Sequence, residues 1–213
     1  MVRIKKFTVN PFQENSYVIY NESGDAIIID PGFYQDDEKE DLMQFIIKGK
    51  FNPVQLLNTH AHLDHIFGNK FVCDAFGLTP YMHELELETH EKAATIGLMY
   101  NLPFDSFVGK PKTLDENEVI NLGEDRLSIH FLPGHSAGSI AFYCEKQHFI
   151  ISGDVLFEGS IGRTDLPGGN YNTLMHSIKE KLFLLPDETI VYSGHGPETT
   201  IGEEKRSNPF LID

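Results

Sequence analysis

The stretch "NTHAHLDH", residues 58–65, places three histidines and one aspartate within six consecutive positions of a chain that has ten histidines in 213 residues. Imidazole nitrogen and carboxylate oxygen are common protein ligands of zinc, iron and manganese. We therefore interpret this stretch as part of a metal site. Six residues cannot close a catalytic centre alone, so further ligands are expected elsewhere in the chain.

Other candidate ligands follow apolar segments that are typical of β-strands. Four residues share this position: His60 after "LLNT", His135 after "HFLPG", Asp154 after "FIISG" and His195 after "VYSG". A glycine before three of them permits a sharp turn. Neighbouring strands of an α/β protein end at one edge of their sheet, and ligands commonly bind at such edges. The pattern predicts that these side chains converge.

The spacing within the opening stretch indicates two metal ions. His60 and His62 are two residues apart, so they point the same way on an extended segment. Asp64 and His65 come where the chain enters a helix and point elsewhere, so one segment can serve two ions about 3.5 Å apart. We predict two ligand sets, joined by a bridging Asp154: His60, His62 and His135 for one ion, and Asp64, His65 and His195 for the other. Zinc is the predicted metal, with iron, manganese or a single filled position as alternatives.

Composition restricts the partners of the protein. The chain carries 17 Lys and Arg against 32 Asp and Glu, a net charge of −15, which repels nucleic acid and anionic membranes. A small-molecule substrate is expected instead. Neither a signal peptide nor a membrane-spanning stretch is apparent, and Cys73 and Cys144 form no paired motif, so a cytoplasmic location is predicted. The oligomeric state is left open, with a homodimer as one option.

The order of apolar patterns predicts one α/β domain over residues 1–213, with two sheets and helices outside them. Strands are expected at 2–9, 16–20, 26–30, 54–59, 126–132, 139–144, 148–152 and 189–193. Helices are expected at 36–48 with Gly49 as the stop, 64–76, 83–101 and 172–185.

The motifs "HAHLDH", "PGHSAGS", "SGD" and "GHG" together resemble those of the metallo-β-lactamase superfamily. "IIIDPG" (27–32) is similar to the first motif of that family, which implies that Asp30 supports the metal site from behind its ligands. The resemblance covers essentially the whole chain. It implies an αββα sandwich of two mixed β-sheets flanked by helices, with the metals at one edge of the two sheets.

Within the superfamily, the lactamase branch usually has a non-ligand residue at the position of His65 and a cysteine at that of Asp154, and its members are usually exported. These features argue against a lactamase. The segments "GSIGRTDLPGGN" (159–170) and "GHGPETTIGEEKRSNPF" (194–210) are similar to the short bacterial form of the glyoxalase II-like (hydroxyacylglutathione hydrolase-like) enzymes. Classical glyoxalase II has a helical C-terminal region that helps to bind glutathione. Here 18 residues follow His195, and the usual glutathione contacts cannot be placed on them residue by residue.

The resemblance implies a metal-dependent hydrolase that cleaves a thioester, such as hydroxyacylglutathione, by attack of a metal-bridging hydroxide. Asp64 is expected to orient this hydroxide. Three alternatives remain: a mononuclear iron persulfide dioxygenase, with His60, His135 and Asp154 around the iron, a lactonase-type ester hydrolase, and a metal-binding module without catalysis.

Two further features have a functional and a structural interpretation. Arg163 in "GRTD" is interpreted as forming an internal salt bridge with Asp165 or another acidic residue, in preference to supplying a charge near the site. Residues 97–111 are rich in apolar side chains and form either a lid over the substrate or ordinary packing.

Overall fold

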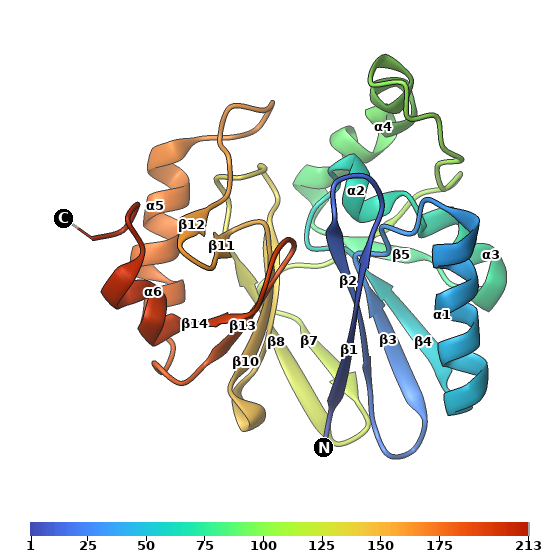
Figure 1. Cartoon of the computed structure of the whole chain (residues 1–213), viewed down its shortest axis with the longest axis horizontal. Coiled ribbons are helices and arrows are strands. Elements are labelled where there is room, and N and C mark those ends of the chain that lie inside the picture. The colour runs from blue at the N-terminus through green and yellow to red at the C-terminus, as the bar shows by residue number, and fades with distance from the viewer. Residues whose placement is uncertain (213) are drawn as a thin grey trace. The chain divides into compact units, whose positions relative to one another are not determined.

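A six-stranded β-sheet organises each of two structural units in the computed structural model, which describes residues 1–212 (Figure 1). The first unit comprises Met1–Leu114 and Leu122–Asp125. The second comprises Asp115–Asn121 and the chain from Arg126 to the C-terminus.

The sheet of the first unit is mixed and has the strand order β1-β2-β3-β4-β5-β6. The strands are β1 (Arg3–Val9), β2 (Glu14–Tyr20), β3 (Asp25–Ile29), β4 (Asn52–Leu57), β5 (Pro80–Met82) and β6 (Lys112–Thr113). The first three are antiparallel, and β3 to β6 are parallel. Helices α1 (Asp36–Gly49) and α3 (Asn69–Phe76) cover this sheet (Figure 1). Their apolar residues Leu42 and Val72 share a buried cluster with Val18, Ile28 and Leu56 of the strands.

The end of α1 differs from the prediction. Gly49 remains helical, and Lys50 takes the left-handed turn with φ +54° that ends the helix. A Cβ atom on Gly49 would come within 2.0 Å of the Phe51 ring, so packing of that ring explains why glycine is needed there. The glycine therefore serves close packing, and its conformational freedom is not used.

The single helix predicted over 64–76 is wrong, because the chain forms α2 (Leu63–Ile66) and α3 with a break between them. At the break, the backbone N–H of Gly68 donates to the carbonyl of Pro31 at 2.7 Å. A Cβ on Gly68 would lie 2.7 Å from that same oxygen. The rest of this unit contains the short 3₁₀ helix η1 (Glu84–Glu86) and α4 (Leu87–Met99).

The sheet of the second unit is also mixed, with the order β14-β13-β10-β9-β8-β7. Its strands are β7 (Val119–Leu122), β8 (Asp125–Phe131), β9 (Ile140–Cys144), β10 (Phe149–Gly153), β13 (Ile190–Ser193) and β14 (Thr199–Thr200); β11 (Leu156–Phe157) and β12 (Ser160–Ile161) form a separate hairpin. β10 and β13 are parallel, whereas β8, β9 and β14 pair with their neighbours in antiparallel fashion.

Helices α5 (Tyr171–Glu180) and α6 (Ile201–Ser207) lie on one side of the second sheet (Figure 1). Leu174 and Ile178 of α5 enter a buried cluster with Ile150 and Val191 of the strands. The helix predicted at 172–185 ends earlier, at Glu180, and is followed by a short 3₁₀ helix, η3 (Leu182–Leu184). The unit also contains the 3₁₀ helix η2 (Glu145–Gln147).

The predicted α/β class, two mixed sheets flanked by helices, is confirmed. A single domain over residues 1–213 stays a prediction, and Asp213 lies outside the described residues. Cys73 and Cys144 are buried, and neither forms a disulfide within residues 1–212. Among residues 1–212, the helices are all too short or too polar to cross a membrane.

The core of the first unit is tested by a pair of substitutions on α1. Leu42 is fully buried, so we expect Leu42→Ala to lower the free energy of unfolding by about 2–5 kcal/mol, through lost apolar burial and the cavity left behind. Ile47 on the same helix is 66% exposed, and Ile47→Ala is expected to change it by less than about 0.5 kcal/mol. Urea denaturation followed by circular dichroism measures both, and equal losses would contradict this description of the core.

Candidate metal centre

Asp30 links the ends of two parallel strands in the first unit. It follows β3, and its N–H donates to the carbonyl of Leu57 at the end of β4 at 2.9 Å. Its Oδ1 accepts from the backbone N–H of Thr59 at 2.7 Å, and its Oδ2 accepts from the Thr59 hydroxyl at 2.6 Å. Asp30 is 1% exposed and has φ +48°, a left-handed conformation that aspartate tolerates. The carboxylate thus fixes the segment that leads into His60.

The Thr59 hydroxyl determines the tautomer of His60. Its proton is donated to Asp30, so its oxygen can only accept from the Nδ1 of His60, which lies 3.0 Å away. Nδ1 therefore carries the ring proton, and Nε2 keeps its lone pair. A neutral imidazole with an oriented lone pair is the form that binds a metal ion.

His65 is fixed in the same tautomer by carboxylates. Its Nδ1 lies 3.1 Å from Asp30 Oδ2 and 3.7 Å from Glu14 Oε1. Nδ1 must therefore hold a proton to donate, which leaves the lone pair on Nε2. That atom lies 3.8 Å from Asp64 Oδ2. A lone pair and a carboxylate oxygen that face each other repel unless a cation lies between them.

His60 and His62 lie on the extended segment after β4, and Asp64 and His65 lie on α2, as predicted. The ring of His60 is centred 4.7 Å from that of His62 and 4.1 Å from that of His65. His60 and His65 are fully buried, whereas His62 and Asp64 are partly exposed. The four predicted ligands of the first unit are therefore neighbours.

In the second unit, the parallel pairing of β10 and β13 aligns Gly153 with Ser193, so Asp154 and His195 follow at the same edge of the sheet. Asp154 Oδ2 lies 3.5 Å from the Nε2 of His195 and 3.5 Å from the Nε2 of His135. The Nδ1 of His135 donates to the carbonyl of Arg163 at 2.9 Å, so its lone pair is again on Nε2 and faces a carboxylate.

Both ligand groups therefore fit a divalent cation. In each group, imidazole nitrogens and carboxylate oxygens face one another with their lone pairs, and a cation between them would relieve the repulsion. Nitrogen and oxygen ligands of this kind suit zinc, iron or manganese. Asp30, His60 and His65 also form a group of potential ligand atoms within 4.8 Å of one another. We interpret Asp30 as a support behind the ligands, because both of its oxygens already accept hydrogen bonds. How the two groups divide the ions stays a prediction.

Three supporting residues were missed by the sequence analysis. Glu86 Oε2 accepts from the backbone N–H of Ala61, between two candidate ligands, at 2.9 Å. Asn10 Nδ2 donates to the backbone carbonyls of Gly32 and Asp64, each at 3.0 Å. The Oε1 of Glu14 lies 3.7 Å from the Nδ1 of His65. Only Asn10 carries a signal in sequence, since asparagine favours the left-handed turns in which it lies, with φ +55°.

Glu14 is fully buried at the start of β2. Burial raises the pKa of its carboxyl well above the usual range, and the nearby Asp30 acts in the same direction, while the hydrogen bond from the Ser16 hydroxyl opposes the rise. The Ser16 hydroxyl donates to Glu14 Oε2 at 2.8 Å. This hydrogen bond fixes the position of a second buried carboxyl group next to the Nδ1 of His65.

The loop 159–170 is attached to the second unit at several points. Gly159 N–H donates to the buried carboxylate of Glu204 at 3.0 Å. The Arg163 side chain forms two bonds of 2.8 Å with Asp165, which confirms the predicted internal salt bridge. A Cβ on Gly162 would lie 2.0 Å from the carbonyl oxygen of Asp154, so the loop runs directly over the end of β10.

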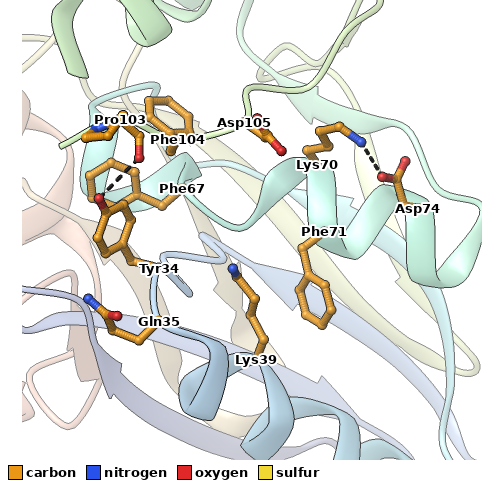
Figure 2. Close-up of a pocket in the computed structure, with 10 residues that line it drawn as sticks. All are labelled: Tyr34, Gln35, Lys39, Phe67, Lys70, Phe71, Asp74, Pro103, Phe104 and Asp105. Atoms are coloured by element: carbon orange, nitrogen blue, oxygen red, sulfur yellow. Dashed lines mark hydrogen bonds and ion pairs between the residues drawn. The ribbon is translucent and has the colours of Figure 1, made fainter. Parts of the chain in front are cut away.

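Residues 97–111 divide between packing and exposure. Phe107 packs against the core of the first unit, whereas Met99 and Val108 are largely exposed. Phe104 helps to line a cavity of about 570 Å³ whose other walls include Tyr34 and Phe67 (Figure 2). The Tyr34 hydroxyl donates to the carbonyl of Pro103 at 3.1 Å, so this part of the segment is attached to the unit. A lid function stays a prediction.

The chain is similar to known proteins over most of its length. A family model described as the metallo-beta-lactamase superfamily matches residues 9–195. Hydroxyacylglutathione hydrolase GloC of Haemophilus influenzae is 39% identical over 212 residues, which are 99% of this chain and 98% of that protein.

Two crystal structures are also similar. That of the BLEG-1 B3 metallo-beta-lactamase is 40% identical with a TM-score of 0.90, covering 99% of this chain and 100% of the other. That of TTHA1623 in a di-iron-bound form is 38% identical with a TM-score of 0.86, covering 97% and 100%.

The salt bridge in the loop 159–170 predicts an unusual titration. The hydrogen bonds from Arg163 lower the pKa of Asp165 to about 2. We expect Arg163→Gln to return it toward about 3.9, its value in model peptides. Because the folded-state pKa is lowered, the pair stabilises the fold above pH about 4, and this contribution is lost as the pH falls toward the folded-state value. NMR titration of the Asp165 carboxyl measures the shift.

Asp187 is the control for this titration, because its lowered pKa depends on Lys205 and should not change in Arg163→Gln. An Asp165 pKa near 4 in the wild-type protein would contradict the salt bridge.

Proposed function

The chain belongs to the metallo-β-lactamase superfamily, a membership that supports a metal-dependent hydrolase, and we propose that its substrate is a thioester of the hydroxyacylglutathione type. The observation that carries the hydrolase assignment is the fixed orientation of the histidines. The Nδ1 atoms of His60, His65 and His135 are engaged by hydrogen-bond partners, which directs each Nε2 lone pair outward for a cation. The substrate class is supported by the similarity to the hydroxyacylglutathione hydrolase of Haemophilus influenzae.

We propose that the seven candidate ligands form one two-metal centre. The proposed sets are His60, His62 and His135 for one ion and Asp64, His65 and His195 for the other, with Asp154 between them. The match of the family model to residues 9–195, which includes all seven, supports a shared centre. Zinc is the proposed metal, and the di-iron-bound relative keeps iron as the alternative.

The bound ions would supply a nucleophilic water near neutral pH and polarise the carbonyl group of the substrate. Asp64 is 16% exposed in its side chain, so its carboxylate can accept a hydrogen bond from that water and orient it. The leaving thiolate has a conjugate acid with a pKa of about 8.5, so its departure needs little help from an acid. A site composed of ligands is therefore sufficient for a thioester.

A second candidate substrate is a β-lactam, favoured by the 40% identity to the BLEG-1 B3 metallo-beta-lactamase. Opening of a β-lactam ring is also nucleophilic attack on a carbonyl carbon. The two substrates differ in the leaving group, which is a thiolate in the thioester and an amine nitrogen in the lactam. The amine is the poorer leaving group, and it requires a proton that the thiolate does not.

The proposed function is tested by assaying the zinc-loaded protein with a hydroxyacyl thioester of glutathione under anaerobic conditions. Release of the free thiol, measured with a thiol-reactive dye, is the expected result. Asp154→Ala should lower kcat/KM at least about 100-fold, because stabilisation of the developing oxyanion is lost with the metal. Glu203→Gln on α6, a substitution of a side chain that is 54% exposed, is the control and should retain activity.

Other outcomes identify the alternatives. Faster hydrolysis of a chromogenic cephalosporin than of the thioester would replace the thioester proposal with a lactamase, and preferential hydrolysis of a lactone would replace it with a lactonase. Oxygen uptake by the iron-loaded protein with glutathione persulfide would indicate a dioxygenase. A protein that binds its metal stoichiometrically and leaves all these substrates unchanged would be a metal-binding module.

A further inference from the structure

We propose that Glu14 is a positioning residue that strengthens binding of the cation held by His65. This inference rests on the metal centre of the proposed function and is independent of the substrate. The Oε1 of Glu14 lies 3.7 Å from the Nδ1 of His65, on the side of the ring opposite to the lone pair that would bind the cation. Glu14 would therefore act through the imidazole.

A short chain of hydrogen bonds holds Glu14 in this position. The N–H of Gly32 donates to the Ser16 hydroxyl at 2.8 Å, and that hydroxyl donates to Glu14 Oε2 at 2.8 Å. Gly32 lies two residues after Asp30, the other carboxylate behind His65. A Cβ on Gly32 would come within 2.1 Å of Glu14 Oε2, so this turn and the carboxylate are in close contact. The two supports of His65 are thus joined to each other.

The other carboxyl oxygen of Glu14, Oε1, is the one that faces His65. Among residues 1–212, no group donates a hydrogen bond to Glu14 Oε1, although the atom is buried. Burying a carboxylate with incomplete hydrogen bonding is costly, and a charged partner is the usual compensation. The imidazole of His65, whose Nδ1 lies 3.7 Å from this oxygen, is a candidate partner, because a cation bound at its Nε2 would place positive charge on the far side of the ring.

The charges around His65 support the same conclusion. Three carboxyl groups face this ring, from Glu14, Asp30 and Asp64, at distances of 3.7, 3.1 and 3.8 Å. A neutral imidazole cannot balance them. A divalent cation at its Nε2 can, because interactions between charges are strong in a buried, low-dielectric site. Removing the charge of Glu14 would therefore weaken cation binding while leaving all seven proposed ligands in place.

Carboxylates behind a ligating histidine raise the basicity of the ring, and their loss typically weakens metal binding by about 10–100-fold. Glu14 Oε1 lies beyond hydrogen-bond distance of the ring, so we expect Glu14→Gln, which keeps the shape of the side chain, to weaken binding of one ion by about 10-fold, the lower end of this range, and to leave binding of the other nearly unchanged. Competition between the protein and a chromophoric chelator for Co²⁺ or Zn²⁺ measures both affinities.

The control is Asp125→Asn. Asp125 is likewise buried, and its Oδ2 lies 3.3 Å from the amino group of Met1. This substitution is expected to lower the melting temperature of the metal-free protein and to leave both metal affinities unchanged. It separates a general loss of stability from a specific effect on the cation.

A double-mutant cycle with His65→Ala tests the route of the effect. If Glu14 acts through His65, Glu14→Gln has no further effect on metal affinity once His65 is removed. Additive losses would overturn the proposal, as would unchanged metal affinity in Glu14→Gln. Should Glu14→Gln fail to fold, Ser16→Ala tests the proposal instead. Loss of the hydrogen bond to Glu14 Oε2 is expected to weaken binding of the same ion several-fold. An unchanged affinity in Ser16→Ala would overturn the proposal.

These measurements are separate from the test of the proposed function. A wild-type protein that binds a single ion, with an affinity that Glu14→Gln lowers, would contradict the two-metal centre and support the role of Glu14. A wild-type protein that binds two ions and cleaves the thioester, with affinities that Glu14→Gln does not change, would support the function and overturn the role of Glu14.

Discussion

The buried carboxylate of Asp30 is the group on which the arrangement of ligands in the first unit depends. A carboxylate that is 1% exposed must be surrounded by hydrogen-bond donors, and here the donors are the backbone and hydroxyl of Thr59 and the ring of His65. The hydrogen bonds of this one carboxylate therefore join the end of β3 to the segment after β4 and to α2. The tautomers of His60 and His65 follow from this network without any contribution from a metal.

The second unit reaches the same result by different means. There the backbone carbonyl of Arg163 holds the Nδ1 of His135, and the loop that supplies it is attached at Gly159 to Glu204. The guanidinium of Arg163 is engaged with Asp165, so the contribution of this residue to the site is a backbone oxygen. In both units the ring proton is fixed on Nδ1, and the lone pair that a cation requires is fixed on Nε2.

Burying three carboxyl groups around His65 is costly for a folded chain that has no cation, because ionised carboxylates repel one another and lose their hydration, a cost that also raises the pKa of Glu14. Proteins commonly retain such costs where they serve function. Glu14 is the clearest case, since its Oε1 is buried and accepts no hydrogen bond from any group within residues 1–212. The arrangement is therefore better explained by a bound divalent cation than by the stability of the metal-free fold.

Much of this arrangement is encoded locally. The spacing of "HAHLDH" was sufficient to predict that two histidines lie on an extended segment and that Asp64 and His65 lie at the start of a helix, and apolar runs located the strands before His60, Asp154 and His195. Short strands such as β5 and β6 were missed because two or three residues carry no readable periodicity. The break before α3 was missed because its cause, the carbonyl of Pro31, lies far away in sequence.

The identity of the candidate ligands and their order along the chain were thus determined by the sequence itself, since both depend on residue type and on neighbours a few positions away. The burial of Glu14, the contact of Glu86 with Ala61 and the tautomers of three histidines were decided only by the tertiary structure. They depend on which groups from distant segments come within hydrogen-bonding distance, and on the loss of water around them, neither of which is specified by local pattern.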